Sequence, residues 1–288
     1  MKIEVAKRAG FCFGVKRAVK LAFETAGSSE LPVYTLGPII HNPQVVEELE
    51  KVGVKAVASP GGIRRGTVII RSHGVHPKIL RQLRRQGLSV VDATCPFVTK
   101  AQRAAEALRR EGRQVVIVGE SEHPEVIALR GYAGREAVVY NTRDRIRIKS
   151  RIGVLAQTTL STEIFCKALC DLAARSLDMH VFNTICQATQ IRQQDTMELA
   201  QRSEVMVVVG GRNSANTSRL VELCRKVGRP TYHVETAEEL KAGWFREADQ
   251  VGVTAGASTP EATVRKVVAR IRKITKQSRR AEVERRKG

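Results

Sequence analysis

The sequence predicts an α/β protein built from three similar units, each with a small, mostly parallel sheet. Short apolar runs alternate with segments of helical periodicity along the whole chain. Three cysteines, Cys12, Cys95 and Cys186, each follow such a run and precede such a segment, at intervals of about 85 residues. Polar loops recur at similar distances after each cysteine. A repeat of this length exceeds that of the common solenoids and suits a whole α/β unit used three times.

The elements are expected in a regular order, with glycine or proline at most of the boundaries. Strands are expected at residues 3–6, 33–36, 54–59, 67–72, 88–93, 114–119, 137–142, 151–156, 179–184, 204–210, 230–235 and 250–255. Helices are expected at 14–26, 44–53, 77–87, 98–112, 125–134, 161–176, 190–203, 216–228 and 260–276.

The natural boundaries between the units lie near the cysteines. We expect one unit at residues 13–95 and a second at 96–184. The third would comprise 185–276 together with 1–12, whose strand would complete its sheet. Residues 277–288 would form a basic tail that is frayed or disordered.

Composition limits the class of protein. The 288 residues are 42% hydrophobic, which is ordinary for a globular protein, but only 4% aromatic, which argues against a stacking platform for single-stranded nucleic acid. No apolar run is long enough for a membrane span, and the N-terminus is too polar for a secretory signal. Six cysteines are too sparse for a disulfide scaffold. We therefore expect a cytoplasmic protein with reduced thiols and no membrane association.

The formal net charge of +20 is the most unusual feature of the composition. It is compatible with nucleic acid, anionic lipid or acidic protein partners, and equally with a solvated, arginine-rich surface. A basic protein also suits a phosphate-bearing substrate and an acidic electron carrier.

The three repeated cysteines predict a metal centre. A thiol at a helix N-terminus favours the anionic thiolate. Three thiolates leave a four-coordinate site one ligand short, and an open position is what a catalytic centre needs. Zinc and an iron–sulfur cluster are both compatible with thiolate ligands. The remaining cysteines, Cys166, Cys170 and Cys224, are expected to be buried in the core.

The polar loops predict an anion-binding pocket. Small polar residues and histidines follow strands at equivalent places in the repeats, and the ends of parallel strands are where open α/β sheets bind ligands. Imidazoles, hydroxyls, amides and glycine-rich backbone N–H groups suit phosphate oxygens. The residues concerned are His41, His73, His123, Thr158, Ser214, Asn216 and Ser258.

Glu125 follows His123 in the sequence EHPEV, at an expected helix start. A carboxylate beside an anion pocket is unfavourable unless it donates a proton. The simpler alternative is an exposed first-turn glutamate that stabilises the helix N-terminus.

Taken together, AGFCFGVKRAV, GPIIHNP, RSHGV, DATCP, EHPEV, AQTTLS, NTICQATQIRQ, NSANTSRL and GVTAGASTP resemble the motifs of the 4-hydroxy-3-methylbut-2-enyl diphosphate reductases, which catalyse the last step of the non-mevalonate isoprenoid pathway. The resemblance extends from residue 1 to about residue 275 and leaves out the basic tail.

The resemblance implies a trefoil of three α/β units around a central [4Fe-4S] cluster held by Cys12, Cys95 and Cys186. The fourth iron would bind the hydroxyl of a small allylic diphosphate. The reaction would be a two-electron, two-proton reductive dehydroxylation, which yields isopentenyl and dimethylallyl diphosphates. An acidic carrier such as ferredoxin or flavodoxin would supply the electrons.

The resemblance also implies the roles of the pocket residues. Glu125 would relay a proton, and Thr158 would form a hydrogen bond near the substrate hydroxyl. The diphosphate would be bound by His41, His73, His123, Ser214, Asn216 and Ser258.

Two positions depart from the motifs. Ala215 stands where many members have a second hydroxyl, so only its backbone N–H would bind phosphate. Ala156 replaces a common threonine.

Two other functions compete with this one. A basic nucleic-acid-binding protein with a structural metal would leave the repeated His, Ser and Asn loops unexplained, so nucleic acid is not the expected partner. A zinc hydrolase would use the same thiolates and histidines but would be colourless.

Overall fold

The computed structural model describes residues 1–141 and 146–287, with side chains described as far as residue 277. The chain divides into two compact units. The larger unit is Phe13–Gln190, and the smaller unit combines Met1–Cys12 with Ile191–Gly288. Among the described residues, no helix is both long enough and apolar enough to cross a bilayer.

The described residues form three four-stranded sheets, and every recorded strand pair in them is parallel. The predicted α/β class with small parallel sheets is therefore confirmed. The larger unit contains two of these sheets and the smaller unit one.

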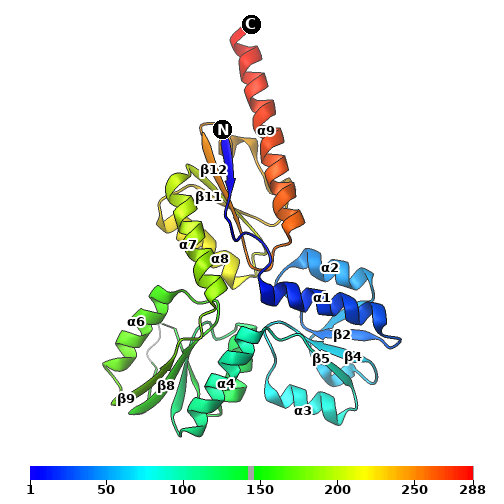
Figure 1. Cartoon of the computed structure of the whole chain (residues 1–288), viewed down its shortest axis with the longest axis vertical. Helices are drawn as coiled ribbons and strands as arrows, with labels where there is room; N and C mark the ends of the chain where they lie inside the picture. Colours follow the sequence, from blue (N-terminus) through cyan, green and yellow to red (C-terminus); the bar gives the residue numbers. More distant parts are fainter. Residues whose placement is uncertain (142–145, 288) are drawn as a thin grey trace. The chain divides into compact units, whose positions relative to one another are not determined.

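The first sheet of the larger unit has the order β3-β2-β4-β5. Figure 1 labels β2, β4 and β5 of this sheet. Its strands are β2 (Val33–Leu36), β3 (Val54–Val57), β4 (Thr67–Ile70) and β5 (Ser89–Asp92). The helices that accompany it are α1 (Phe13–Ser28), α2 (Pro43–Lys51) and α3 (Pro77–Arg85). Leu36, Val68 and Ile70 pack against Leu83 of α3 in one hydrophobic cluster. All four residues of β4 are buried, as expected for a central parallel strand covered on both faces.

The second sheet has the order β7-β6-β8-β9. Its strands are β6 (Gln114–Val118), β7 (Val138–Tyr140), β8 (Arg151–Ala156) and β9 (Asp178–Phe182), and its helices are α4 (Pro96–Arg110), α5 (Pro124–Ala133) and α6 (Thr162–Ala173). Alternate residues of β6 point to opposite faces, because the side-chain period of a strand is two. Val115 and Ile117 pack with α4 and α5, whereas Val116 and Val118 pack with α6. The far end of the strand predicted at 137–142 lies outside the described residues.

The sheet of the smaller unit has the order β1-β12-β10-β11. Its strands are β1 (Lys2–Val5), β10 (Val205–Val209), β11 (Thr231–Val234) and β12 (Gln250–Ala255), and its helices are α7 (Gln187–Arg202), α8 (Ala215–Lys226) and α9 (Glu261–Lys287). The first residues of α7 belong to the larger unit. Val207 and Val253 pack with α9, and Met206 and Val208 pack with α7 and α8.

The three sheets share one strand order. In each, the strand that precedes a cysteine lies at one edge of the sheet: β5 lies next to β4, β9 next to β8, and β1 next to β12. In the smaller unit this edge strand is β1, which pairs with β12 from the other end of the chain.

Two features differ from the sequence predictions. Helix α9 continues to Lys287 instead of ending near Lys276, because no glycine or proline interrupts the sequence from Glu261 to Lys287. The predicted burial of Cys166 and Cys170 is wrong, since both are exposed. They lie one turn apart on α6, as their spacing requires, but the buried face of that helix is formed by Phe165, Ala168 and Leu172. Cys224 is buried, as predicted.

Candidate active site

Cys12, Cys95 and Cys186 each directly precede a helix, as the sequence predicts. Each backbone N–H donates to a carbonyl in the loop that follows the neighbouring strand of its sheet, which is β4, β8 or β12. Cys95 donates to Ser72 at 2.9 Å, Cys186 to Thr158 at 2.9 Å, and Cys12 to Ala257 at 3.1 Å. The repeat is therefore visible at the level of single hydrogen bonds, and each cysteine is tied to a loop that contains a predicted site residue.

The Cys95 thiol packs closely against helix α1. Helix α1 passes this thiol at Gly14, where an added Cβ would lie only 2.4 Å from Cys95 Sγ. Cys95 and Cys186 are half-buried, and the Cys95 side chain does not cap α4. A cysteine at a helix N-terminus whose side chain does not cap the helix fits the requirements of a metal–sulfur ligand.

The larger unit brings His41, His73 and His123 together. The ring centroids of His41 and His73 are 4.5 Å apart, those of His73 and His123 5.5 Å, and those of His41 and His123 5.8 Å. Each histidine follows the carboxyl end of a central strand, β2, β4 or β6. Loops that are distant in the sequence therefore contribute to one cluster.

The three imidazoles are kept uncharged near neutral pH. Burial is the main cause in every case: it lowers the pKa of His41, takes that of His73 well below its usual range, and brings that of His123 to about 4. His123 Nδ1 accepts a hydrogen bond from the Glu125 N–H at 3.2 Å, so the proton of the neutral ring is assigned to Nε2. His123 is consequently a hydrogen-bond donor.

This arrangement favours an anion over a metal ion. Ligand nitrogens of the three histidines lie within 4.8 Å of one another, which is close enough for a metal site. However, a donor N–H on His123 Nε2 leaves no lone pair there for a cation. The positive charge of Arg71 acts on all three rings and would repel a cation.

Arg71, whose charge acts on this cluster, is not among the residues predicted to bind an anion. It is the first residue after β4, two positions before His73 in the motif RSHGV. A cationic residue next to a predicted anion-binding histidine was the available indication.

Glu125 is almost completely buried, with a relative exposure of 1%. The Thr158 hydroxyl donates to Oε2 at 2.7 Å, and the Thr158 backbone N–H donates to Oε1 at 2.7 Å. Burial raises the pKa of Glu125 to about 7, although these hydrogen bonds oppose the shift. The alternative of an exposed first-turn glutamate is wrong. Glu125 is a carboxyl group suited to exchanging a proton near neutral pH.

The smaller unit contains a group of hydroxyl and amide side chains. Ser214 caps helix α8, and the Ser258 hydroxyl donates to the Ser214 hydroxyl at 3.5 Å. Ala215 and Asn216 occupy the first turn of α8, whose backbone N–H groups suit an anion. The Asn216 side chain is buried, and neither its oxygen nor its nitrogen has a hydrogen-bond partner among the described residues. A buried amide of this kind suits a ligand.

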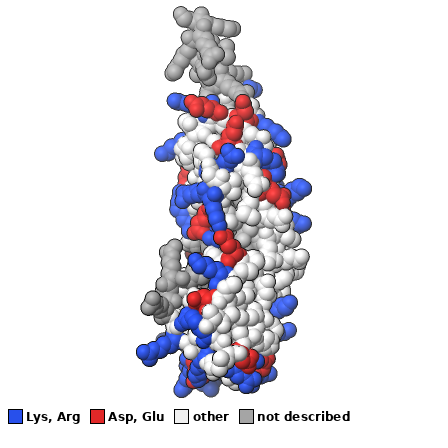
Figure 2. Space-filling view, turned by 90° about the vertical axis from the view of Figure 1, so that its left-hand side faces the viewer, with Lys and Arg blue, Asp and Glu red and all other residues white. Residues whose placement is uncertain are grey.

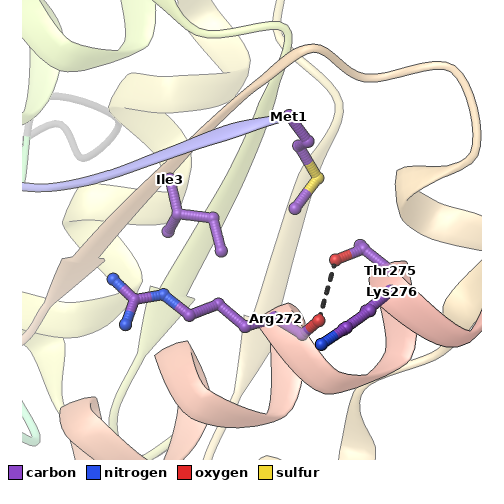
Figure 3. Close-up of a pocket in the computed structure, with 5 residues that line it drawn as sticks. All are labelled: Met1, Ile3, Arg272, Thr275 and Lys276. Carbon is purple, nitrogen blue, oxygen red and sulfur yellow. Dashed lines mark hydrogen bonds between the residues drawn. The ribbon is translucent and has the colours of Figure 1, made fainter.

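A further pocket in the smaller unit, between β1 and α9, does not have the features of a catalytic site. Figure 3 shows it lined by Met1, Ile3, Arg272, Thr275 and Lys276. The Thr275 hydroxyl donates back to helix carbonyls, to Ile271 at 2.8 Å and Arg272 at 3.2 Å. None of the five lining residues is a carboxylate, a histidine or a thiol.

The surface charge is mixed. Figure 2 shows Lys and Arg interspersed with Asp and Glu on one face. Ion pairs use part of the positive charge, as between Arg113 and Asp178 at 2.8 Å and between Arg202 and Glu4 at 2.6 Å. This pattern differs from the continuous basic stripe that follows a nucleic-acid backbone.

Comparison with known proteins identifies the family. The family model for the LytB protein matches residues 3–272. This chain belongs to the LytB protein family.

Two relatives in this LytB family illustrate the similarity. A 4-hydroxy-3-methylbut-2-enyl diphosphate reductase of Pelobacter propionicus is 47% identical over 281 residues, covering 96% of this chain and all of the relative. The reductase of the same name from Geobacter sulfurreducens is 49% identical over 277 residues, covering 95% and 98%.

Two solved structures resemble this LytB chain. The structure of an (E)-4-hydroxy-3-methyl-but-2-enyl diphosphate reductase, described as the terminal enzyme of the non-mevalonate pathway, has a TM-score of 0.71 and 45% identity, covering 95% of this chain and all of that one. The E-1-hydroxy-2-methyl-but-2-enyl-4-diphosphate reductase of Plasmodium falciparum has a TM-score of 0.88 and 25% identity, covering 93% and 86%.

Proposed function

We propose that this LytB protein is the 4-hydroxy-3-methylbut-2-enyl diphosphate reductase, which removes the substrate's hydroxyl group to give isopentenyl and dimethylallyl diphosphates. In the balanced reaction, two electrons and two protons enter, the C–O bond breaks, a C–H bond forms and water leaves. The observation that carries the proposal is the Glu125 carboxyl, which is buried, accepts two hydrogen bonds from Thr158 and lies two residues after His123 of the histidine cluster. The names of the relatives agree with it.

In this proposal Cys12, Cys95 and Cys186 hold a [4Fe-4S] cluster. Their equivalent backbone hydrogen bonds support the assignment, and so does Gly14, where any side chain would clash with the Cys95 thiol. When bound, the cluster would supply electrons and a Lewis acid with an open coordination position. A cytoplasmic location, where thiols remain reduced, suits such a centre.

The chain's own side chains bind the diphosphate and provide a proton. We assign phosphate binding to His41, His73, His123, Ser214, Asn216 and Ser258, and to the backbone N–H of Ala215. The neutral imidazoles and the amide offer N–H donors to phosphate oxygens. Thr158 positions Glu125 through two hydrogen bonds, and Glu125 donates a proton to the departing hydroxyl oxygen.

The proposal is tested by anaerobic assay of the brown holoprotein. The purified protein should oxidise reduced methyl viologen only when the hydroxylated allylic diphosphate is added, and it should release both isoprenoid diphosphates. Replacing Cys12, Cys95 or Cys186 with Ser should remove the broad visible absorption and the activity, whereas Cys166→Ser, at an exposed position, should change neither. A fully loaded protein that does not turn over this substrate would refute the proposed function.

We further propose that an acidic electron carrier, such as ferredoxin or flavodoxin, docks beside Cys95. A groove there is lined by three cations, Arg17, Lys100 and Arg103, together with Asp92 and neutral residues. Phe97, two residues after Cys95, is partly exposed and adds an apolar contact. A basic rim near a cluster ligand complements an acidic redox protein and would speed its association.

Charge reversal separates docking from chemistry. K100E/R103E should slow reduction by the protein carrier at low ionic strength by at least about tenfold, while turnover with methyl viologen remains unchanged. R109E/R110E, on the same helix α4 but outside the groove, is the matched control. If both double substitutions slow reduction by the protein carrier equally, the docking surface does not lie in this groove.

A further inference from the structure

We propose that Arg71 binds the substrate's diphosphate directly and supplies the fixed positive charge of the pocket in the larger unit. The inference rests on the proposed function and extends it to a residue outside the predicted anion-binding set.

The backbone of Arg71 is held in a tight turn between two histidine loops. The Gly74 N–H donates to the Arg71 carbonyl at 2.9 Å, and Gly74 has a φ of 71°, a conformation that favours glycine. The Ser72 N–H and hydroxyl both donate to the Ile39 carbonyl, at 3.2 and 3.1 Å. The loop that contains Arg71 and His73 is therefore fastened to the loop that contains His41.

The guanidinium group occupies space that a glycine leaves open. A Cβ added at Gly37 would lie 2.7 Å from Arg71 Nη1. Gly37 also has a φ of 71°, so both its conformation and the nearby guanidinium disfavour a side chain there. Gly37 begins the sequence GPIIHNP, which leads to His41.

Arg71 is a half-buried cation without a counter-ion in the described structure. Burial lowers the pKa of Arg71, but arginine remains protonated in proteins. Its Nε is buried without a hydrogen-bond partner, and no ion pair among the described residues includes Arg71. A buried charge is costly unless it is paired. An anionic ligand would provide that pairing.

The histidines cannot supply this charge themselves. Burial keeps them neutral, and Arg71 lowers the pKa of each one further, which places its charge near all three rings. Three neutral N–H donors orient a diphosphate but do not neutralise it. The planar guanidinium carries a permanent charge and can donate two parallel hydrogen bonds to phosphate oxygens.

Pyrophosphate binding, measured by calorimetry on the anaerobic holoprotein, tests the inference without turnover. R71M removes the charge and should weaken pyrophosphate binding at least about tenfold. R71K keeps the positive charge but cannot donate two parallel hydrogen bonds, so it should bind pyrophosphate with intermediate affinity. R110M is the matched control, because it removes the same charge from an exposed surface pair with Glu106.

A second measurement distinguishes direct contact between Arg71 and the diphosphate from a purely structural role of Arg71 in its loop. In R71M, binding should also become less sensitive to salt, since one ionic contact is lost, and KM should rise by more than kcat falls. If R71M does not fold, R71Q takes its place with the same expectation. The inference is overturned if the folded neutral variant binds pyrophosphate as well as R110M does, or if R71K binds no better than R71M or R71Q. Failure of the proposed function would instead appear as absence of turnover in the wild-type protein.

Discussion

Thr158 binds both oxygens of the Glu125 carboxyl group, the hydroxyl to Oε2 and the backbone N–H to Oε1, each at 2.7 Å. The Cys186 N–H donates to the carbonyl of the same threonine at 2.9 Å. Thr158, in the loop that follows β8, thus connects the buried acid of α5 with a proposed cluster ligand. The acid is held in a fixed position, while its burial keeps the proton available near neutral pH.

Glu125→Gln preserves the size of the side chain but removes the titratable proton. A positioned acid typically contributes about 10²–10⁴-fold in rate, so turnover should fall by at least about two orders of magnitude. Iron content and pyrophosphate affinity should stay near those of the wild type. Glu122→Gln is the control, because Glu122 is exposed in the same loop. A Glu125→Gln protein that turns over within a few-fold of wild type would move the proton source to water or to the diphosphate.

The sequence was sufficient to predict the positions of the elements and of the three cysteines, because strand and helix periodicity and the repeat spacing are local properties. It was also sufficient to predict that His41, His73 and His123 follow strands, which is the arrangement that lets them cluster. It did not predict which face of α6 is buried, since the i, i+4 spacing of Cys166 and Cys170 fixes a shared face but not its orientation. Nor did it identify Arg71, whose isolation from carboxylates is a property of the folded chain.

Stability should depend on pH through Glu125. Burial raises its pKa from 4.5 to about 7, so the native state favours the protonated form. The associated stabilisation is complete below pH 4.5 and is lost as the pH rises through about 7, an effect of about 3 kcal/mol.

This pH dependence can be measured by thermal unfolding of anaerobic protein at pH 5 and pH 8. On going from pH 5 to pH 8, the unfolding temperature of Glu125→Gln should rise by several degrees relative to that of the wild type, because glutamine does not ionise. Glu122→Gln should follow the wild type at both. A constant difference between wild type and Glu125→Gln would mean that Glu125 does not titrate in this range.

Asn216 should show a trade-off between binding and stability. Its buried amide lacks partners among the described residues, and an unsatisfied buried polar group costs about 1–3 kcal/mol. Asn216→Ala removes this cost, so the free energy of unfolding without ligand should stay level or rise, although a buried side chain is truncated. Pyrophosphate binding should weaken at least about tenfold.

The exposed Asn213 of the same motif provides the comparison for Asn216. Asn213→Ala should change neither the free energy of unfolding nor the affinity for pyrophosphate appreciably. A destabilised Asn216→Ala protein with normal pyrophosphate affinity would make Asn216 a structural residue.

Gly14 should affect cluster binding because it packs directly against Cys95. A Cβ at position 14 would lie 2.4 Å from Cys95 Sγ, closer than nonbonded atoms can approach, and 3.2 Å from Cys95 Cβ, which is a tight contact. The sulfur belongs to the N-cap residue of α4, whose backbone N–H is bonded to Ser72, so the side chain must move instead. Gly14→Ala should therefore displace one proposed ligand and lower iron and sulfide content and visible absorption by at least about half.

Gly27→Ala tests whether such a loss comes from crowding of the thiol or from the change in helix composition. Gly27 lies in the same helix α1, and a Cβ there would meet nothing within 4 Å. Alanine favours a helix interior over glycine by about 1 kcal/mol, so Gly27→Ala should be neutral or stabilising, with full cluster content. Gly14→Ala gains the same helical preference, and any loss of cluster must then come from its contact with Cys95. If both variants retain full iron, sulfide and visible absorption, the space beside Cys95 is not required for the cluster, and the fit of Gly14 to the metal centre would have to be abandoned.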